Sequence, residues 1–305
     1  MYFTKLPDHT APGFDEQEHF RRFSRHNVIF NALSRQIRCD NHVGCLSLKT
    51  ILSGEEWYMV EGRRIAVRRS QCLILNDGQH YACRIEPTAG AHVLSIFFQK
   101  DFAAAIFNDM LQSEETLLDN PSPQTAQPIP QFFQTLHPVS PDLGARLSSL
   151  RNHLEIFGDD QNQTDEHLTF LLRFLLHTHR TETRLVSAVH STKPSAKREI
   201  LRRLCIAKDI LHSEFRERID LSRLSRQSFL STPQLIRQFK SVFKKTPYQY
   251  LVSIRLRHAA EALTETDAPV QEIGWLSGFE NASAFCRAFR AAYGHSPERY
   301  RLQAR

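Results

Sequence analysis

The spacing of hydrophobic positions changes about halfway along the chain. From Cys45 to Phe98, short apolar runs rich in β-branched and aromatic residues alternate with turn sequences such as Asn76-Asp77-Gly78. Runs of this length, separated at this interval, are typical of a β-sandwich or a small barrel. The pattern therefore predicts one antiparallel β-domain. Its strands are expected at residues 46–52, 57–60, 64–67, 72–75, 81–85 and 93–98.

Helical spacing begins near Leu143 and continues to the C-terminus. Within residues 164–179, leucines recur every three or four positions and form one apolar helical face. Two roles fit this face equally well: packing on the β-domain, or pairing with the same helix of a second copy in a homodimer. The segment 187–196, which contains Lys193-Pro194-Ser195, is the expected linker. It divides the chain into domains at 1–186 and 197–305.

The C-terminal domain contains two similar helix-turn-helix patterns. Leu235 and Phe239 in the first pattern recur as Phe285 and Phe289 in the second, at an offset of 50 residues. An internal repeat of this kind indicates two copies of one structural unit. Residues four apart lie on one helical face, so each pair is expected to dock its helix on a core and leave the opposite face free. Helix-turn-helix modules read bases with the N-terminal part of this second helix.

The free faces supply the candidate DNA contacts. Arg237 and Arg287 occupy the same position in the two copies, and each can donate two hydrogen bonds to one guanine. Lys240 and Arg290, one turn further on, are better suited to phosphate contacts. The complete set of candidate DNA-binding residues is Thr232, Pro233, Gln234, Ile236, Arg237 and Lys240 in the first copy, and Asn281, Ala282, Ser283, Arg287 and Arg290 in the second.

A third helix is expected between the two copies. Thr246 is a typical N-cap, Pro247 suits the first helical position, and the apolar pattern continues to about Leu263. At 1.5 Å per residue this helix is about 26 Å long. With the width of the modules added, that length is close to the roughly 34 Å between successive major-groove faces. One chain is therefore expected to place both recognition helices on one face of double-stranded DNA.

Charge is distributed unevenly between the two parts. Residues 195–305 carry 20 basic and 11 acidic side chains, a net charge of +9, whereas residues 1–194 carry 19 and 22, a net charge of −3. The excess positive charge favours a polyanionic partner for the C-terminal part alone.

Other composition features exclude several classes of protein. No apolar run approaches the roughly 20 residues that span a bilayer, and the N-terminus lacks a secretory signal, so a cytoplasmic protein without a membrane segment is expected. The six cysteines form no C-x-x-C pair, and we expect them to be reduced, buried and free of metal.

Residues 197–305 resemble the DNA-binding domain of the AraC/XylS family of bacterial transcription regulators. The resemblance covers about 105 residues, including the pattern Leu-Ser-x-x-x-Leu-x-Arg-x-Phe-Lys at 230–240. Ser225 and Gly274 depart from it, because the family usually has Ala at these positions. The resemblance implies a sequence-specific regulator, such as an activator, with RNA polymerase as a further partner. The other matching residues are Gly278-Phe279, Ser283, Phe285, Arg287, Phe289, Tyr293-Gly294, Ser296-Pro297 and Tyr300-Arg301.

In this family a β-barrel resembling a cupin often precedes the DNA-binding domain and holds a small effector. The resemblance therefore implies an α+β multidomain fold, in which an N-terminal cupin-like β-barrel is followed by an all-α tandem helix-turn-helix domain. Trp57, Tyr58 and His80 are the candidate effector-binding residues. His42 is isolated in the sequence, unlike the His-x-His cluster of metal cupins, so no metal ligands and no cofactor are expected.

The leading hypothesis is an effector-responsive transcription regulator that is not an enzyme. The alternative is a metal-dependent cupin enzyme fused to a DNA-binding domain. A third hypothesis is an architectural DNA-binding protein without a ligand.

Overall fold

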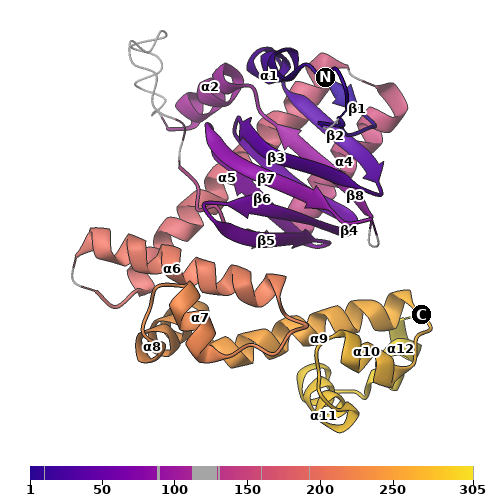
Figure 1. The fold of residues 1–305 in the computed structure, drawn as a ribbon, viewed down its shortest axis with the longest axis vertical. Coiled ribbons are helices and arrows are strands. Elements are labelled where there is room, and N and C mark those ends of the chain that lie inside the picture. The colour runs from indigo at the N-terminus through magenta and orange to yellow at the C-terminus, as the bar shows by residue number, and fades with distance from the viewer. Residues whose placement is uncertain are drawn as a thin grey trace. The chain divides into compact units, whose positions relative to one another are not determined.

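The protein folds into two compact units, seen here in a computed structural model (Figure 1). The N-terminal unit is Met1–Arg184 and the C-terminal unit is Leu185–Arg305. The division thus lies two residues before the expected linker. The structure describes residues 1–9, 11–87, 90–111, 129, 131–158, 160–191 and 193–304.

The described strands of the N-terminal unit form two sheets that share one long strand, β4. The first sheet has the order β1-β2-β8-β4-β6-β9, and in the second β4 lies between β5 and β7, with β3 beyond β7. All pairs are antiparallel except β1 with β2. The strands are β1 Tyr2–Phe3, β2 Val28–Ser34, β3 Ile37–Gly44, β4 Ser47–Val60, β5 Arg63–Arg68, β6 Gln71–Leu75, β7 Gln79–Ile85, β8 Ala91–Phe97 and β9 Leu136–Pro138.

A glycine marks the place where β4 leaves the first sheet and enters the second. The register between β4 and β8 shifts between Ile51 and Ser53, next to Gly54. Gly54 has a φ of +78°, and a Cβ atom there would lie 2.0 Å from the Gly90 carbonyl oxygen. Only glycine permits this approach of two backbones. The two expected strands at 46–52 and 57–60 are therefore halves of one bent strand.

The closed cupin-like barrel expected from the resemblance is not confirmed. In the described ladders, β1 and β9 are the edges of the first sheet, and β3 and β5 are the edges of the second. A barrel requires every strand to be hydrogen-bonded on both sides. The structure therefore supports an open pair of β-sheets followed by a helical domain.

Three elements before Cys45 belong to the β-domain and were not expected from the sequence. They are β2, β3 and helix α1, Glu16–Arg25, which Asp15 caps by accepting a hydrogen bond from the Glu18 amide at 2.9 Å. In β2, five consecutive residues from Val28 are buried. The apolar run Val28-Ile29-Phe30 was the available signal for this strand.

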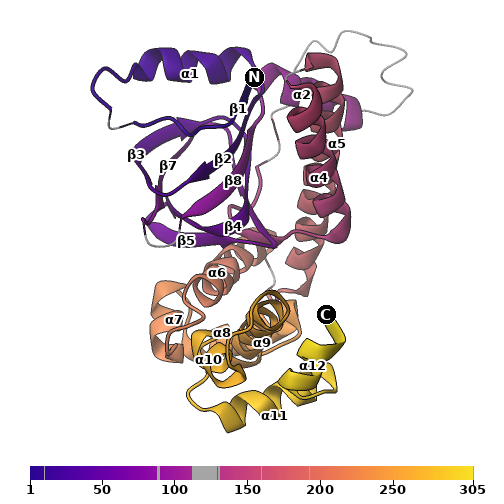
Figure 2. The same ribbon diagram turned by 90° about the vertical axis from the view of Figure 1, so that its right-hand side faces the viewer.

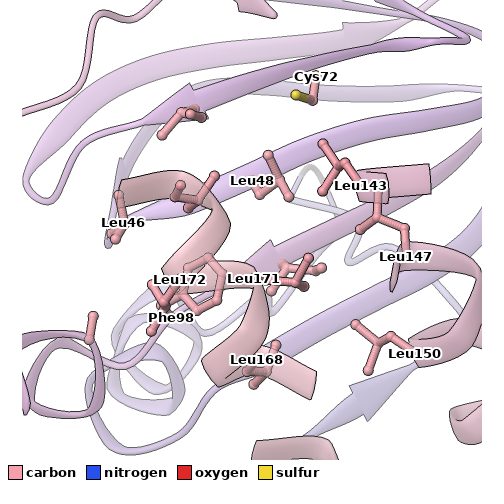
Figure 3. Packing of buried hydrophobic residues seen from close by; sticks show 14 of the residues in the cluster. Leu46, Leu48, Cys72, Phe98, Leu143, Leu147, Leu150, Leu168, Leu171 and Leu172 are labelled. Carbon is pink, nitrogen blue, oxygen red and sulfur yellow. The ribbon is translucent and has the colours of Figure 1, made fainter. Parts of the chain in front are cut away.

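Two long helices, α4 (Pro141–Phe157) and α5 (Gln161–Leu185), cover one face of the first sheet (Figure 2). The leucines of α5 belong to one buried cluster with sheet residues such as Leu46 and Leu48 (Figure 3). Leu168 and Leu172 have no exposed surface. Of the two roles considered for this apolar face, the structure supports packing on the β-domain. The expected helix at 101–111 is α2, Lys100–Leu111.

The described C-terminal unit is helical. Residues of the expected linker pack on it, because Gln238 donates to the His190 carbonyl at 2.8 Å and Ser241 donates to the Ala188 carbonyl at 2.7 Å. The helices are the 3-10 helix η1 Val186–Ala188, then α6 Pro194–Ser213, α7 Leu221–Gln227, α8 Thr232–Phe243, α9 Pro247–Glu265, α10 Val270–Leu276, α11 Ala282–Tyr293 and α12 Pro297–Ala304. In the described part of the chain, no helix is long and apolar enough to cross a membrane.

Candidate nucleic-acid interface

Helices α7 and α8 form the first helix-turn-helix module. Asp220 caps α7 by accepting hydrogen bonds from the Ser222 and Arg223 amides, both at 3.2 Å. Helix α8 begins with Thr232-Pro233, where the missing amide proton of proline costs nothing. Leu235 and Phe239 have no exposed surface. The predicted docking face of α8 is therefore confirmed.

Helices α10 and α11 form the second module in the same way. Asn281 caps α11 by accepting a hydrogen bond from the Ala284 amide at 2.7 Å. Phe285 and Phe289 have no exposed surface and lie in a cluster with Leu263 and Ile273. The Phe289 ring lies 4.6 Å from Tyr293 and 5.3 Å from Tyr300, measured between centroids.

The turns of the two modules differ by one residue. Leu230 donates to the Ser225 carbonyl, and Phe279 donates to the Gly274 carbonyl, each at 3.0 Å. These positions correspond at an offset of 49, whereas Leu235 and Phe285 correspond at 50. The second turn therefore contains one additional residue. Because the recognition helices still end on equivalent buried positions, the repeat found in the sequence survives this insertion.

The recognition helices expose the same positions. From the N-caps Ser231 and Asn281 onward, seven successive residues show the same order of exposed, half-buried and buried side chains. Arg237 and Arg287 are both exposed and face away from their cores. Within the residues that the structure describes, neither guanidinium has an ion pair. Both are thus placed to meet a ligand outside the protein.

The other candidate DNA contacts divide into three groups. Pro233, Ser283, Lys240 and Arg290 are exposed on the same helices, whereas Gln234, Ile236 and Ala282 are half-buried. Thr232 and Asn281 already have structural roles. Thr232 donates to the Ser225 hydroxyl at 3.1 Å, and the Asn281 carbonyl oxygen caps α11.

Helix α9 joins the modules and begins as expected. Thr246 accepts from the Gln249 amide at 3.3 Å, while the Gln249 side chain accepts from the Thr246 amide at 3.0 Å. This reciprocal pair is a capping box. With 19 residues, α9 is about 28 Å long.

Arg255, near the middle of α9, connects the modules and was missed by the sequence analysis. Its guanidinium donates to the carbonyls of Phe215 and Glu217, both at 2.8 Å, in the loop between α6 and α7. Phe215 is buried and stacks on His258 of α9 with ring centroids 4.1 Å apart. Burial lowers the pKa of Arg255, which remains a cation at neutral pH. No sequence motif identifies Arg255, because its partners are backbone carbonyls some 40 residues earlier.

Gly278 lies at the same joint, and we expect its replacement by alanine to lower the free energy of unfolding by about 2–3 kcal/mol. Its φ is +87°, and a Cβ would lie 2.8 Å from the Phe215 carbonyl oxygen and 2.9 Å from Arg255 Nε. Gly294→Ala is the matched control, because Gly294 has a φ of +78° but nothing within 4 Å of its Cβ position. Urea unfolding should show a loss of about 1–2 kcal/mol for this control. Equal losses would contradict a steric role for Gly278.

The candidate effector residues lie in different places. Tyr58 is buried, donates to Glu56 at 2.7 Å and lines a cavity between the sheets. Trp57 is stacked under Arg64, with 4.0 Å between the guanidinium carbon and the ring centroid, and His80 is exposed. Neither Trp57 nor His80 lines the described cavity that contains Tyr58.

Comparison with known proteins matches the C-terminal unit. The model of a family described as "Helix-turn-helix domain" matches residues 224–303. The probable transcriptional regulator LumQ of Photobacterium leiognathi is 35% identical over 92 residues, which are 30% of this chain and 37% of LumQ. The uncharacterized HTH-type transcriptional regulator YdiP of Escherichia coli is 31% identical over 120 residues, 38% of each chain.

A solved structure matches the same region. The DNA-binding domain of AdpA, in complex with a target DNA, is 27% identical, with 33% of this chain and 91% of that chain covered and a TM-score of 0.32. A transcriptional regulator of Chromobacterium violaceum, described as an AraC-type DNA-binding domain-containing protein, is 24% identical with the same coverage and TM-score. The chain spans little more than a third of the length of the curated relatives quoted, which are named as regulators and not as enzymes.

Proposed function

Because the C-terminal part of this chain is an AraC-type helix-turn-helix domain, we propose that the whole protein is a transcription regulator that binds specific double-stranded DNA. The observation that carries the proposal is the pair of equivalent, exposed arginines, Arg237 and Arg287. They lie on two recognition helices whose opposite faces are fully buried. An arginine at this position of a recognition helix can bond a guanine edge in the major groove.

The remaining exposed cations support a division of labour on the DNA. Lys240 and Arg290 occupy the last turns of α8 and α11, beyond the base-reading turns. At these positions they are suited to phosphate contacts, which position a protein without reading sequence. Lys244 has a different role, since its ammonium donates to the Ser241 carbonyl at 2.7 Å at the end of α8. RNA polymerase is a further partner that follows from this class of regulator.

The N-terminal unit offers a place for a small-molecule effector. A cavity of about 220 Å³ opens between the N-terminal segment, α1 and β2. Phe3, Phe23 and Phe30 give it an apolar wall, and Lys5 and Arg22 are exposed cations on its rim. A small molecule with an apolar body and an acidic group fits this combination. Regulation then requires that its binding changes the affinity of the full chain for DNA.

Measurement of DNA affinity with the full chain tests the proposal. An operator selected from random DNA should bind at least about 1,000-fold more tightly than unrelated DNA of equal length at physiological salt. The logarithm of the affinity should fall linearly with the logarithm of the salt concentration, because phosphate contacts release counterions. Equal affinity for selected and unrelated DNA would contradict a sequence-specific regulator and would favour an architectural protein.

A further inference from the structure

A second, smaller cavity lies inside the N-terminal unit and gathers metal-ligating side chains. Its volume is about 40 Å³, and it is lined by His9, His19, Cys39, His42 and Cys83. A space of this size holds a water molecule or a single ion, whereas sites for organic ligands are typically about 300–1,000 Å³. The lining therefore favours an ion over an organic effector at this position.

A β-bulge brings Cys39 and His42 to the same side of β3. In a regular strand, residues three apart point to opposite faces. Here Cys39 pairs with Cys83 and His42 pairs with Tyr81, so three steps along β3 match two steps along β7. One additional residue in β3 rotates the chain between them, and both side chains are buried.

The two other histidines come from the segment before the sheet. His9 precedes α1, and His19 lies on α1 itself. The His19 ring lies 5.0 Å from His9 and 5.7 Å from His42, measured between centroids. The ligating atoms of His9, Cys39 and His42 all lie within 4.8 Å of one another. In a tetrahedral zinc site such atoms are about 3.3–3.8 Å apart, so a contraction of about 1 Å brings them to bonding distance.

The protonation states in the cavity suit metal binding. Hydrogen bonds from Cys83 and then from His42 and His9 lower the pKa of Cys39, and the thiolate is the form that binds metal. Burial, with His9 and His42 nearby, lowers the pKa of His19 to about 4, which leaves a neutral imidazole at physiological pH. Lys49 lines the same cavity, but its ammonium lies over the Phe97 ring, 3.3 Å from the centroid.

We propose that His9, Cys39 and His42 form a binding site for zinc or another divalent ion of the same ligand preference, with His19 as the fourth ligand. Mixed thiolate and imidazole ligands are those that Zn²⁺ prefers in tetrahedral sites. The sequence analysis expected no such cluster, because His42 has no histidine neighbour along the chain. The three elements that supply the ligands meet only in the folded β-domain. The site is independent of the proposed DNA-binding function.

Cobalt titration of the full chain, reduced and freed of metal, tests the proposal. One equivalent of Co²⁺ should produce a thiolate-to-cobalt charge-transfer band in the near ultraviolet, and one equivalent of Zn²⁺ should remove it. Cys39→Ser should abolish the band. Cys72→Ser is the matched control, because Cys72 is a buried cysteine that faces the helix-covered core, and it should keep the band. A wild-type chain without the band, or a band that survives in Cys39→Ser, would overturn the proposal.

A second variant keeps the proposal testable if Cys39→Ser fails to fold. His9 is only half-buried and lies in the segment before α1, so His9→Ala should leave the sheets intact. Its zinc affinity, measured by competition with a chromophoric chelator, should be weaker by at least about 100-fold. Unchanged affinity would overturn the proposed ligand set. A disulfide between Cys39 and Cys83 that forms in air in the presence of zinc would also overturn it and would indicate a redox pair.

Discussion

Replacement of both Arg237 and Arg287 by alanine is expected to lower the discrimination between operator and altered DNA by about 2–6 kcal/mol. Each arginine that bonds a guanine contributes about 1–3 kcal/mol at its own base pair, and contributions from separate positions add. The two residues lie on different helices, α8 and α11, and both are exposed. The check is a competition assay in which the selected operator carries a substitution at one contacted base pair at a time.

The control for this prediction is the pair Lys240→Ala and Arg290→Ala. These substitutions also remove two exposed cations from the same helices. As phosphate contacts they should weaken binding to all sequences alike and reduce the salt dependence by about one counterion each. If the arginine pair also weakened binding uniformly, with discrimination unchanged, Arg237 and Arg287 would be phosphate contacts.

Phe289→Ala is expected to lower the free energy of unfolding of the C-terminal unit by about 3–5 kcal/mol. The side chain has no exposed surface and packs among Phe285, Tyr293 and Tyr300. Its removal costs the burial free energy of the ring and leaves a cavity under α11. Since domains are typically stable by about 5–15 kcal/mol, this loss loosens the second recognition helix.

Urea unfolding followed by tryptophan fluorescence measures this loss. The chain has two tryptophans, so a Trp57→Phe background leaves Trp275 of α10 as the reporter of the second module. The control is Phe229→Ala, which removes the same ring from a site that is 67% exposed. It should change the free energy by no more than about 0.5 kcal/mol. Equal losses for the two variants would contradict the assignment of Phe289 to the core.

The recognition helices could be predicted from the sequence because their information is local. Leu235, Phe239, Phe285 and Phe289 follow helical periodicity, and the second copy repeats the spacing of the first. A helix with one apolar stripe has only one way to bury it. The structure confirms both docking faces, and the assignment of individual base contacts stays a prediction.

The β-domain was predicted less completely because its strands depend on distant partners. β2 and β3 lie before the expected start of the domain, and β2 is paired with β8 some 60 residues later. The closed barrel was not confirmed, since closure depends on which strand edges meet. Periodicity predicts that a segment forms a strand, but it does not specify its neighbours.

By itself, the sequence determined the two helix-turn-helix modules, the helix between them and the excess of positive charge in the last third, because each depends on residues close together along the chain. The tertiary structure alone decided where distant residues meet. Arg255 reaches backbone carbonyls of an earlier loop, and a bulge in β3 with the N-terminal segment folded over it brings His9, Cys39 and His42 within 4.8 Å. Such contacts depend on side-chain direction and strand register, which one extra residue in a strand is enough to change.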